Sequence, residues 1–200
     1  MRLVLASGNR KKLAEMQRIF EKMGIEMVCA PDIGVSMDDC EETGDTFEEN
    51  AQIKALYVMK RCGEPSVADD SGLEVFALDN RPGVYSARYG GDGLDDGGRT
   101  ALLLKELEKV PDTERGGRFV SCICCAFPDG TFLETRGECE GEILRETRGT
   151  GGFGYDPVFL YPPLSKSYAE LSPEEKDTIS HRAKSLEKFA EGLCARLIGE

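Results

Sequence analysis

Two adjacent carboxylates, Asp69 and Asp70, end a short apolar run in the segment SVADDSGLEV. Neighbouring acidic side chains at the end of a buried strand repel each other and lose hydration, so this placement costs free energy. One interpretation is a simple turn, because Asp, Ser and Gly are common turn residues. The other is a cation site, since a bound cation would offset the cost of both carboxylates.

A second polar segment, SGNRKK at residues 7–12, follows the apolar run RLVLA. If that run is a strand and a helix follows, the turn presents backbone N–H groups and a positive dipole end to an anion. Lys12 would add a full charge. The spacings of a Walker loop and of a dinucleotide fingerprint are both absent. The alternative is a polar turn before an exposed, lysine-bearing helix.

The acidic stretch DDCEETGDTFEEN, residues 38–50, is typical of a solvated loop. Glu49 also fits the third position of a capping box that begins at Thr46. Glu42 or Glu49 at this junction between loop and helix could nevertheless face the aspartate pair. Magnesium suits such an oxygen site, because it takes one or two carboxylates and completes its shell with water and phosphate.

Two later segments add candidates for binding a planar, anionic ligand. In GTGGFGYD, residues 149–156, glycines allow close backbone approach and two aromatic rings are available for stacking. In KDTISHR, residues 176–182, Lys176 and Arg182 are among the few cations of an acidic chain, and His181 is its only histidine. Each has a structural alternative, because glycine-rich hairpin ends are common and a lone histidine is more often structural than catalytic.

The elements that must position these residues follow from hydrophobic periodicity and from start and stop signals. We expect strands at 2–6 and 25–30, helices at 11–22, 46–61 and 181–197, strands on either side of the Asp-Ser-Gly motif, and a long hairpin at 117–144. Capping boxes mark helix starts at Thr46 and Ser172. This alternation predicts one α/β unit with a mixed sheet and two lobes.

Composition narrows the function classes. A formal charge of −12 over 200 residues disfavours a nucleic-acid scaffold or a membrane-surface protein, since both usually need a basic face. The start MRLVLASGNRKK is too short and too quickly charged for a signal peptide. The eight cysteines are scattered or lie in the strand-like run FVSCICCAF, which indicates reduced, mostly buried thiols in a cytoplasmic protein.

Six segments together resemble the inosine triphosphate pyrophosphatase family: LASGNRKKLAE, EETGDTFEENAQIKA, ADDSGLEV, PGVYSARY, GTGGFGYDPVF and AELSPEEKDTISHRAKSL. They span nearly the whole chain. Enzymes of that family cleave non-standard purine nucleoside triphosphates (ITP, dITP, XTP) to the monophosphate and pyrophosphate. The resemblance implies an elongated two-lobed α/β fold around a mixed, twisted sheet with flanking helices. It also implies a single domain over residues 1–200 with a central cleft, usually in a homodimer.

The resemblance further implies roles at matching positions. Asp70 would be the general base for the attacking water and, with Glu42, would hold Mg²⁺. The triphosphate would be held by Ser7, Gly8, Asn9 and Lys12. The substrate would also be contacted by Arg10, Lys11 and Ser71. The base would be held by Phe153, Gly154, Tyr155, Asp156, Lys176, His181 and Arg182. Supporting positions would be Asp69, Glu49 and Arg88.

Two alternatives to this function remain open. A Maf-type nucleotide pyrophosphatase would also begin with LAS and basic residues, but it would lack the GGFGYDP and SHR segments. A nucleotide-binding protein without turnover would bind the same ligand and release no product. In each case we expect a small-molecule nucleotide as the ligand, and neither nucleic acid nor a membrane as a partner.

Overall fold

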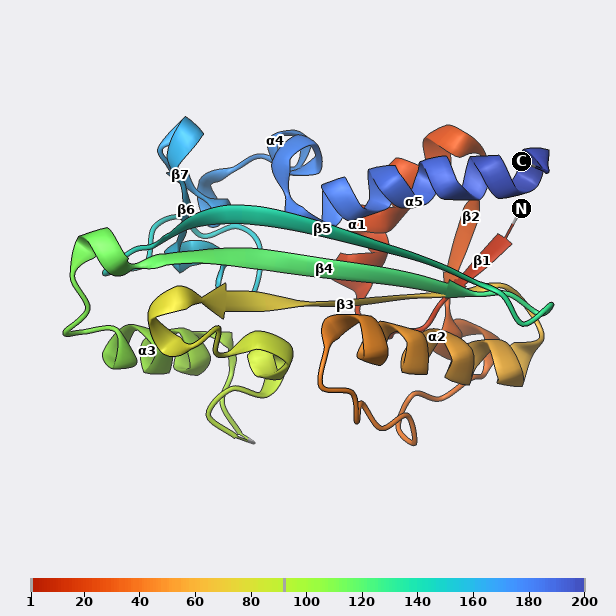
Figure 1. Cartoon of the computed structure of the whole chain (residues 1–200), viewed down its shortest axis with the longest axis horizontal. Coiled ribbons are helices and arrows are strands. Elements are labelled where there is room, and N and C mark those ends of the chain that lie inside the picture. The colour runs from red at the N-terminus through yellow and green to blue at the C-terminus, as the bar shows by residue number, and fades with distance from the viewer. Residues whose placement is uncertain (1, 92, 200) are drawn as a thin grey trace. The chain divides into compact units, whose positions relative to one another are not determined.

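One mixed β-sheet forms the framework of the computed structural model, which describes residues 2–91 and 93–199 (Figure 1). Within this part of the chain the strand order is β2-β1-β3-β4-β5-β6-β7. The strands are β1 (Arg2–Leu5), β2 (Glu26–Cys29), β3 (Ser66–Val75), β4 (Gly116–Ala126), β5 (Phe132–Ile143), β6 (Phe159–Tyr161) and β7 (Lys166–Ser167). The α-helices are α1 (Arg10–Phe20), α2 (Phe47–Cys62), α3 (Asp96–Glu106), α4 (Pro173–Ile179) and α5 (His181–Ile198).

Strand directions confirm the predicted α/β class with a mixed sheet. Strand β1 is parallel to both β2 and β3, whereas β6 is antiparallel to both β5 and β7. The capping boxes at Thr46 and Ser172 are both formed, and the predicted long hairpin corresponds to β4 and β5.

The chain divides into two compact units that are each built from separated segments. Unit 1 comprises Met1–Asp70, Ser121–Gly137 and Lys184–Glu200, and unit 2 comprises Ser71–Val120 and Glu138–Ala183. The division passes through β3 between Asp70 and Ser71. The prediction of a single domain with a central cleft stays a prediction.

The sheet of unit 1 is covered by helices on both faces (Figure 1). Alternate strand residues point to opposite faces. One face packs on α1 and α5 through a cluster that includes Leu5, Val67, Ile123, Phe20 and Phe189. The other face packs on α2 through Val4, Ala68, Cys124, Ala51 and Ala55. Because residue 67 faces α1 and residue 68 faces α2, this alternation directs residue 69 toward α1 and residue 70 toward α2.

Unit 2 has its own core around an aromatic cluster. The ring of Phe119 lies 4.7 Å from that of Phe159, 5.4 Å from Tyr168 and 4.8 Å from His181, measured between ring centroids. Leu103 of α3 packs into the same hydrophobic core. This core supports the segments that carry the second set of predicted site residues.

The predicted break at the Asp-Ser-Gly motif is wrong. Strand β3 runs without interruption from Ser66 to Val75, and Asp69 and Asp70 are both buried within it. The backbone stays extended because the polar side chains of the motif find partners on their own faces of the strand, as described below. The turn interpretation of these residues is therefore excluded.

Five of the eight cysteines are buried, whereas Cys40 and Cys62 are partly exposed and Cys194 is exposed. All eight are free, and Cys122, Cys124 and Cys125 are buried on both faces of β4. Burial raises the pKa of Cys125 to about 12 and also raises the pKa values of the other two thiols. These thiols are therefore protonated packing residues near neutral pH.

Among the described residues, no helix is long and apolar enough to cross a membrane.

Candidate active site

Asp69 is paired with the lysine that the sequence singles out in the first turn of α1. Its Oδ2 lies 2.7 Å from Lys12 Nζ, and its Oδ1 accepts a hydrogen bond of 2.6 Å from Ser121 Oγ. The Asp69 side chain is completely buried, and Lys12 also donates to its backbone carbonyl at 3.1 Å. The buried carboxylate is thus neutralised on the α1 face of the sheet, where it fixes Lys12 in place.

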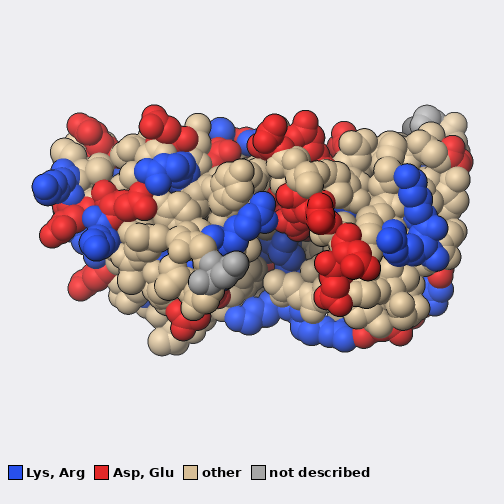
Figure 2. Space-filling view, turned by 90° about the horizontal axis from the view of Figure 1, so that it is seen from below, with Lys and Arg blue, Asp and Glu red and all other residues tan. Residues whose placement is uncertain are grey.

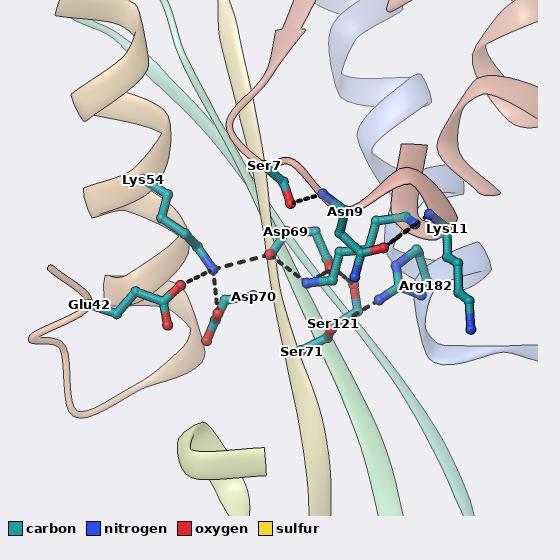
Figure 3. Close-up of polar contacts among 11 residues, drawn as sticks. Ser7, Asn9, Lys11, Glu42, Lys54, Asp69, Asp70, Ser71, Ser121 and Arg182 are labelled. Carbon is teal, nitrogen blue, oxygen red and sulfur yellow. Dashed lines mark hydrogen bonds and ion pairs between the residues drawn. The ribbon is translucent and has the colours of Figure 1, made fainter. Parts of the chain in front are cut away.

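Asp70 points to the opposite face and is paired with Lys54 of α2 (Figure 3). Lys54 Nζ lies 2.5 Å from Asp70 Oδ1 and 2.9 Å from Glu42 Oε1, and it donates to the Asp69 carbonyl at 3.3 Å. The Lys54 and Asp70 side chains are about nine-tenths buried, whereas Glu42 is 30% exposed. One ammonium group therefore bridges the two carboxylates that were predicted to hold a metal.

Burial sets the electrostatics of this group. It is the main cause of a raised pKa at Asp70, against the opposing effects of Lys54 and Lys12. For Lys54 burial lowers the pKa, but the carboxylates of Asp70 and Glu42 outweigh it and the net shift is upward. A carboxylate whose pKa lies above its ordinary value is better suited to take a proton from water than an exposed one.

The loop that carries Glu42 is fixed by a buried amide of α2. Asn50 is completely buried; its Oδ1 accepts from Gly44 N at 2.8 Å and its Nδ2 donates to Gly44 O at 3.2 Å. A Cβ at Gly44 would lie 2.6 Å from Glu49 Cβ and 2.9 Å from Asn50 Oδ1. Only glycine allows the loop to approach α2 this closely, and this approach holds Glu42 at the end of the loop.

The turn before α1 is already capped by its own side chains. Asn9 Oδ1 accepts from the backbone N–H groups of Lys11 and Lys12 at 3.0 and 3.2 Å, and Ser7 Oγ accepts from Asn9 N at 3.0 Å. These three N–H groups are thus bonded in this structure, which differs from the expectation of a turn with free donors. An anion would compete with the two side-chain oxygens for these donors.

In unit 2 the glycine-rich loop closes around a buried ion pair. Asp156 Oδ2 lies 2.7 Å from Lys176 Nζ and accepts from Phe153 N at 2.9 Å. Gly152 has a φ of +73°, and a Cβ there would overlap the Asp156 carboxylate. The Lys176 ammonium also lies 5.2 Å from the centroid of the Phe153 ring. Aspartate, lysine and aromatic ring therefore form one compact group.

Two further predicted residues lie close to this group. The side chain of Arg182 is buried, lies 5.8 Å from the Phe153 ring centroid, and donates to Ser71 Oγ at 2.9 Å. His181 is buried in the aromatic cluster, nearly parallel to the Phe119 ring at 15°. Within unit 2 the predicted base-binding residues Phe153, Asp156, Lys176 and Arg182 thus lie close together.

Several predicted residues have local structural partners. Arg10 forms an exposed pair with Asp32, Glu49 Oε2 accepts from the backbone N–H of Thr46 in the capping box, and Arg88 is exposed. Tyr155 donates to Ser86 O at 3.0 Å, and Gly154 N donates to Asp96 Oδ2 at 2.9 Å. Lys11 and Gly8 are exposed. Their proposed ligand contacts stay predictions.

Three residues of the site were missed from the sequence: Lys54, Ser121 and Asn50. A signal was present for two of them. Asn50 and Lys54 are four residues apart and share a helix face with Ala51 and Ala55, so both are polar residues at inward positions. Ser121 gave no such signal, because a serine within a strand is unremarkable.

The donor set suits a hard divalent cation. Glu42 and Asp70 supply carboxylate oxygens around a position that the Lys54 ammonium, itself a cation, already occupies. Across residues 2–91 and 93–199, no group of three or more His, Cys, Asp or Glu side chains could hold a metal. Two carboxylates leave most of an octahedral shell to water and ligand oxygens, which is the pattern of Mg²⁺ rather than of Zn²⁺.

The contact between Asn50 and Gly44 yields a stability prediction. Asn50→Asp replaces the donor toward Gly44 O with an oxygen, so the variant should lose about 2 kcal/mol of unfolding free energy. Urea denaturation measures this loss, and the matched control is Gln52→Glu on the same helix, which should change stability by less than about 0.5 kcal/mol. Equal stability of the two variants would contradict the assigned contact.

The close approach at Gly152 yields a second prediction. Gly154 has a positive φ of +59°, comparable to that of Gly152, but a Cβ there would lie in open space. Gly154→Ala should therefore cost only about 1–2 kcal/mol of backbone strain. Gly152→Ala adds an overlap with Asp156 and should cost about 1–3 kcal/mol more in the same denaturation experiment. Losses of the same size at both positions would show that Asp156 does not press against residue 152.

Comparisons with known proteins show which family the chain belongs to. A dITP/XTP pyrophosphatase of Desulforamulus reducens is 46% identical over 193 residues, which span 96% of each chain. The solved structure of a HAM1 protein from Coxiella burnetii has a TM-score of 0.89 at 43% identity and covers 97% of this chain and 98% of its own. That of the Staphylococcus aureus Ham1 protein has a TM-score of 0.87 at 38% identity, covering 98% and 100%. The model of the Ham1 family matches residues 3–192, and the chain belongs to that family.

Proposed function

We propose that this protein hydrolyses dITP, XTP and ITP to the nucleoside monophosphate and pyrophosphate, and so removes non-standard purines from the nucleotide pool. Relatives at 42–47% identity over nearly their full length are named dITP/XTP pyrophosphatases. The observation that carries the proposal is the β3 strand, whose consecutive aspartates each hold a different lysine: Asp69 holds Lys12, and Asp70 holds Lys54.

In this proposal Asp70 accepts the proton of the attacking water. Its raised pKa makes it a stronger base than an exposed carboxylate, and its burial keeps its hydration low. Lys12, fixed by Asp69, adds positive charge toward the triphosphate. Because phosphoryl transfer needs charge neutralisation and an oriented nucleophile, these residues supply both requirements.

Mg²⁺ is the proposed cofactor, and Glu42 and Asp70 are the residues that would hold it. When bound, Mg²⁺ would neutralise phosphate charge and lower the pKa of water. Glu49 is a weaker candidate ligand, because one of its carboxylate oxygens accepts from the backbone N–H groups of Asp45 and Thr46. The other side chains act through binding and orientation.

The base would be selected by the side chains of Phe153, Asp156, Lys176 and Arg182 in unit 2. Hypoxanthine and xanthine present a carbonyl at C6, which accepts a hydrogen bond from a donor such as Lys176 or Arg182. Adenine presents an amino group there, so donor would oppose donor. An unmatched buried polar group costs about 1–3 kcal/mol, or roughly ten- to a hundredfold in preference. Phe153 would stack on the purine ring.

The working state is proposed to be a homodimer in the cytoplasm with a nucleotide as its small-molecule partner. The buried, protonated thiols are compatible with a reducing compartment. On the face shown in Figure 2, acidic and basic side chains are interspersed, which does not suit the long phosphate backbone of a nucleic acid. The net charge of −12 also disfavours a nucleic-acid partner.

Product analysis tests the proposed reaction. We expect ITP, dITP and XTP with Mg²⁺ to yield the monophosphate and pyrophosphate, and Asp70→Asn to lower kcat at least about a thousandfold while the protein stays folded. Release of orthophosphate and IDP would contradict the proposal, as would nucleotide binding without product. Faster turnover of pyrimidine or modified nucleotides would favour a Maf-type activity.

A further inference from the structure

We propose that Lys54 is a built-in competitor of the metal. In this inference its ammonium group takes the position between Glu42 and Asp70 that the divalent cation requires, and it must leave when the cation binds. The inference rests on the proposed function only in taking these two carboxylates as the metal ligands.

The geometry of Lys54 supports this role. Its Nζ lies 2.5 Å from Asp70 Oδ1 and 2.9 Å from Glu42 Oε1, so one ammonium group contacts both carboxylates at once (Figure 3). Its side chain is 9% exposed and reaches this position from the inward face of α2, next to Ala51 and Ala55. A lysine this buried is rare unless it is paired.

The charges explain why lysine and metal compete. Two carboxylates that face each other in a buried place are costly without a cation, and the ammonium supplies one positive charge. A divalent cation would supply two, and Glu42 and Asp70 are the residues that would hold it. Because an ammonium group a few ångströms from a divalent cation repels it strongly in a medium of low dielectric constant, both cannot hold these oxygens together. Lys54 thus stabilises the metal-free protein and weakens its affinity for metal.

A second acceptor is available for the displaced ammonium. The backbone carbonyl of Asp69 accepts from Lys54 Nζ at 3.3 Å. It also accepts from Lys12 Nζ at 3.1 Å. A short movement of the lysine end along its flexible stem would release both carboxylates and keep this hydrogen bond. The ammonium would then remain beside the site as an additional positive charge.

Calorimetric titration with MgCl₂ in the absence of nucleotide tests the inference. Lys54→Met removes the charge and keeps the volume, so Mg²⁺ should bind about tenfold more tightly than to the wild type. Lys60→Met, at an exposed position of the same helix, is the matched control and should leave the affinity within twofold. Unchanged or weaker affinity in Lys54→Met would overturn the inference, since Lys54 would then organise the site rather than compete for it.

A measurement on the wild type covers the case in which Lys54→Met does not fold. With lysine labelled at ¹³Cε, the Lys54 resonance is assigned by its loss in Lys54→Arg. Added Mg²⁺ should shift this resonance with the midpoint found by calorimetry and leave that of Lys60 in place. A Lys54 resonance that stays constant through saturation would overturn the inference.

These experiments separate the inference from the proposed function. A wild type that hydrolyses ITP with Mg²⁺, but whose affinity for Mg²⁺ is the same in Lys54→Met, overturns the competitor role alone. A wild type that neither binds Mg²⁺ nor hydrolyses any nucleotide overturns both. Loss of Mg²⁺ binding in Asp70→Asn, together with tighter binding in Lys54→Met, supports the inference, and hydrolysis of ITP by the wild type is needed in addition to support the proposed function.

Discussion

Consecutive residues of a β-strand point to opposite faces, and the candidate site depends on this constraint. In β3 the alternation sends Asp69 toward α1 and Asp70 toward α2. Each carboxylate therefore meets its own lysine, and the two charges that would repel each other in a turn are separated by the strand itself. The free energy that two buried carboxylates cost is offset once on each face of the sheet.

The two helices deliver their lysines in different ways. α1 begins at Arg10 after the capping residue Asn9, so Lys12 lies in the first turn of the helix. Lys54 lies in the middle of α2. The hydrogen bonds between Asn50 and Gly44 hold the loop against this helix, and Glu42 of that loop pairs with Lys54. One lysine is thus held by Asp69 at a helix start, and the other is enclosed between carboxylates.

Local sequence signals predicted much of this arrangement. The capping boxes, the apolar face of α1 and the long hairpin follow from short-range chemistry that the fold does not override. The resemblance supplied the candidate residues, and within each unit the structure brings several of them together, such as Lys12 with Asp69 and Asp156 with Lys176. Those contacts join residues 57 and 20 positions apart, which periodicity alone does not predict.

The failures have a common physical cause. A break was expected in β3 because Asp, Ser and Gly favour turns, but tertiary partners on each face keep the strand extended. Lys54 was overlooked for the same reason, since a lysine is expected to be solvated and its enclosure depends on Glu42 and Asp70 from distant segments. The available signal was the polar residues Asn50 and Lys54 at inward positions of α2, which belong to the site and not to the exposed surface.

Double-mutant cycles on unfolding free energy test the central claim most directly. The cycles combine Lys12→Met or Lys54→Met with Asp69→Asn or Asp70→Asn, in urea and without metal. The account predicts coupling of about 1–3 kcal/mol for the pairs Lys12–Asp69 and Lys54–Asp70, and less than half of that for the crossed pairs. Crossed couplings as large as the matched ones would contradict it, because the two aspartates would then share one electrostatic site instead of facing separate lysines across the strand.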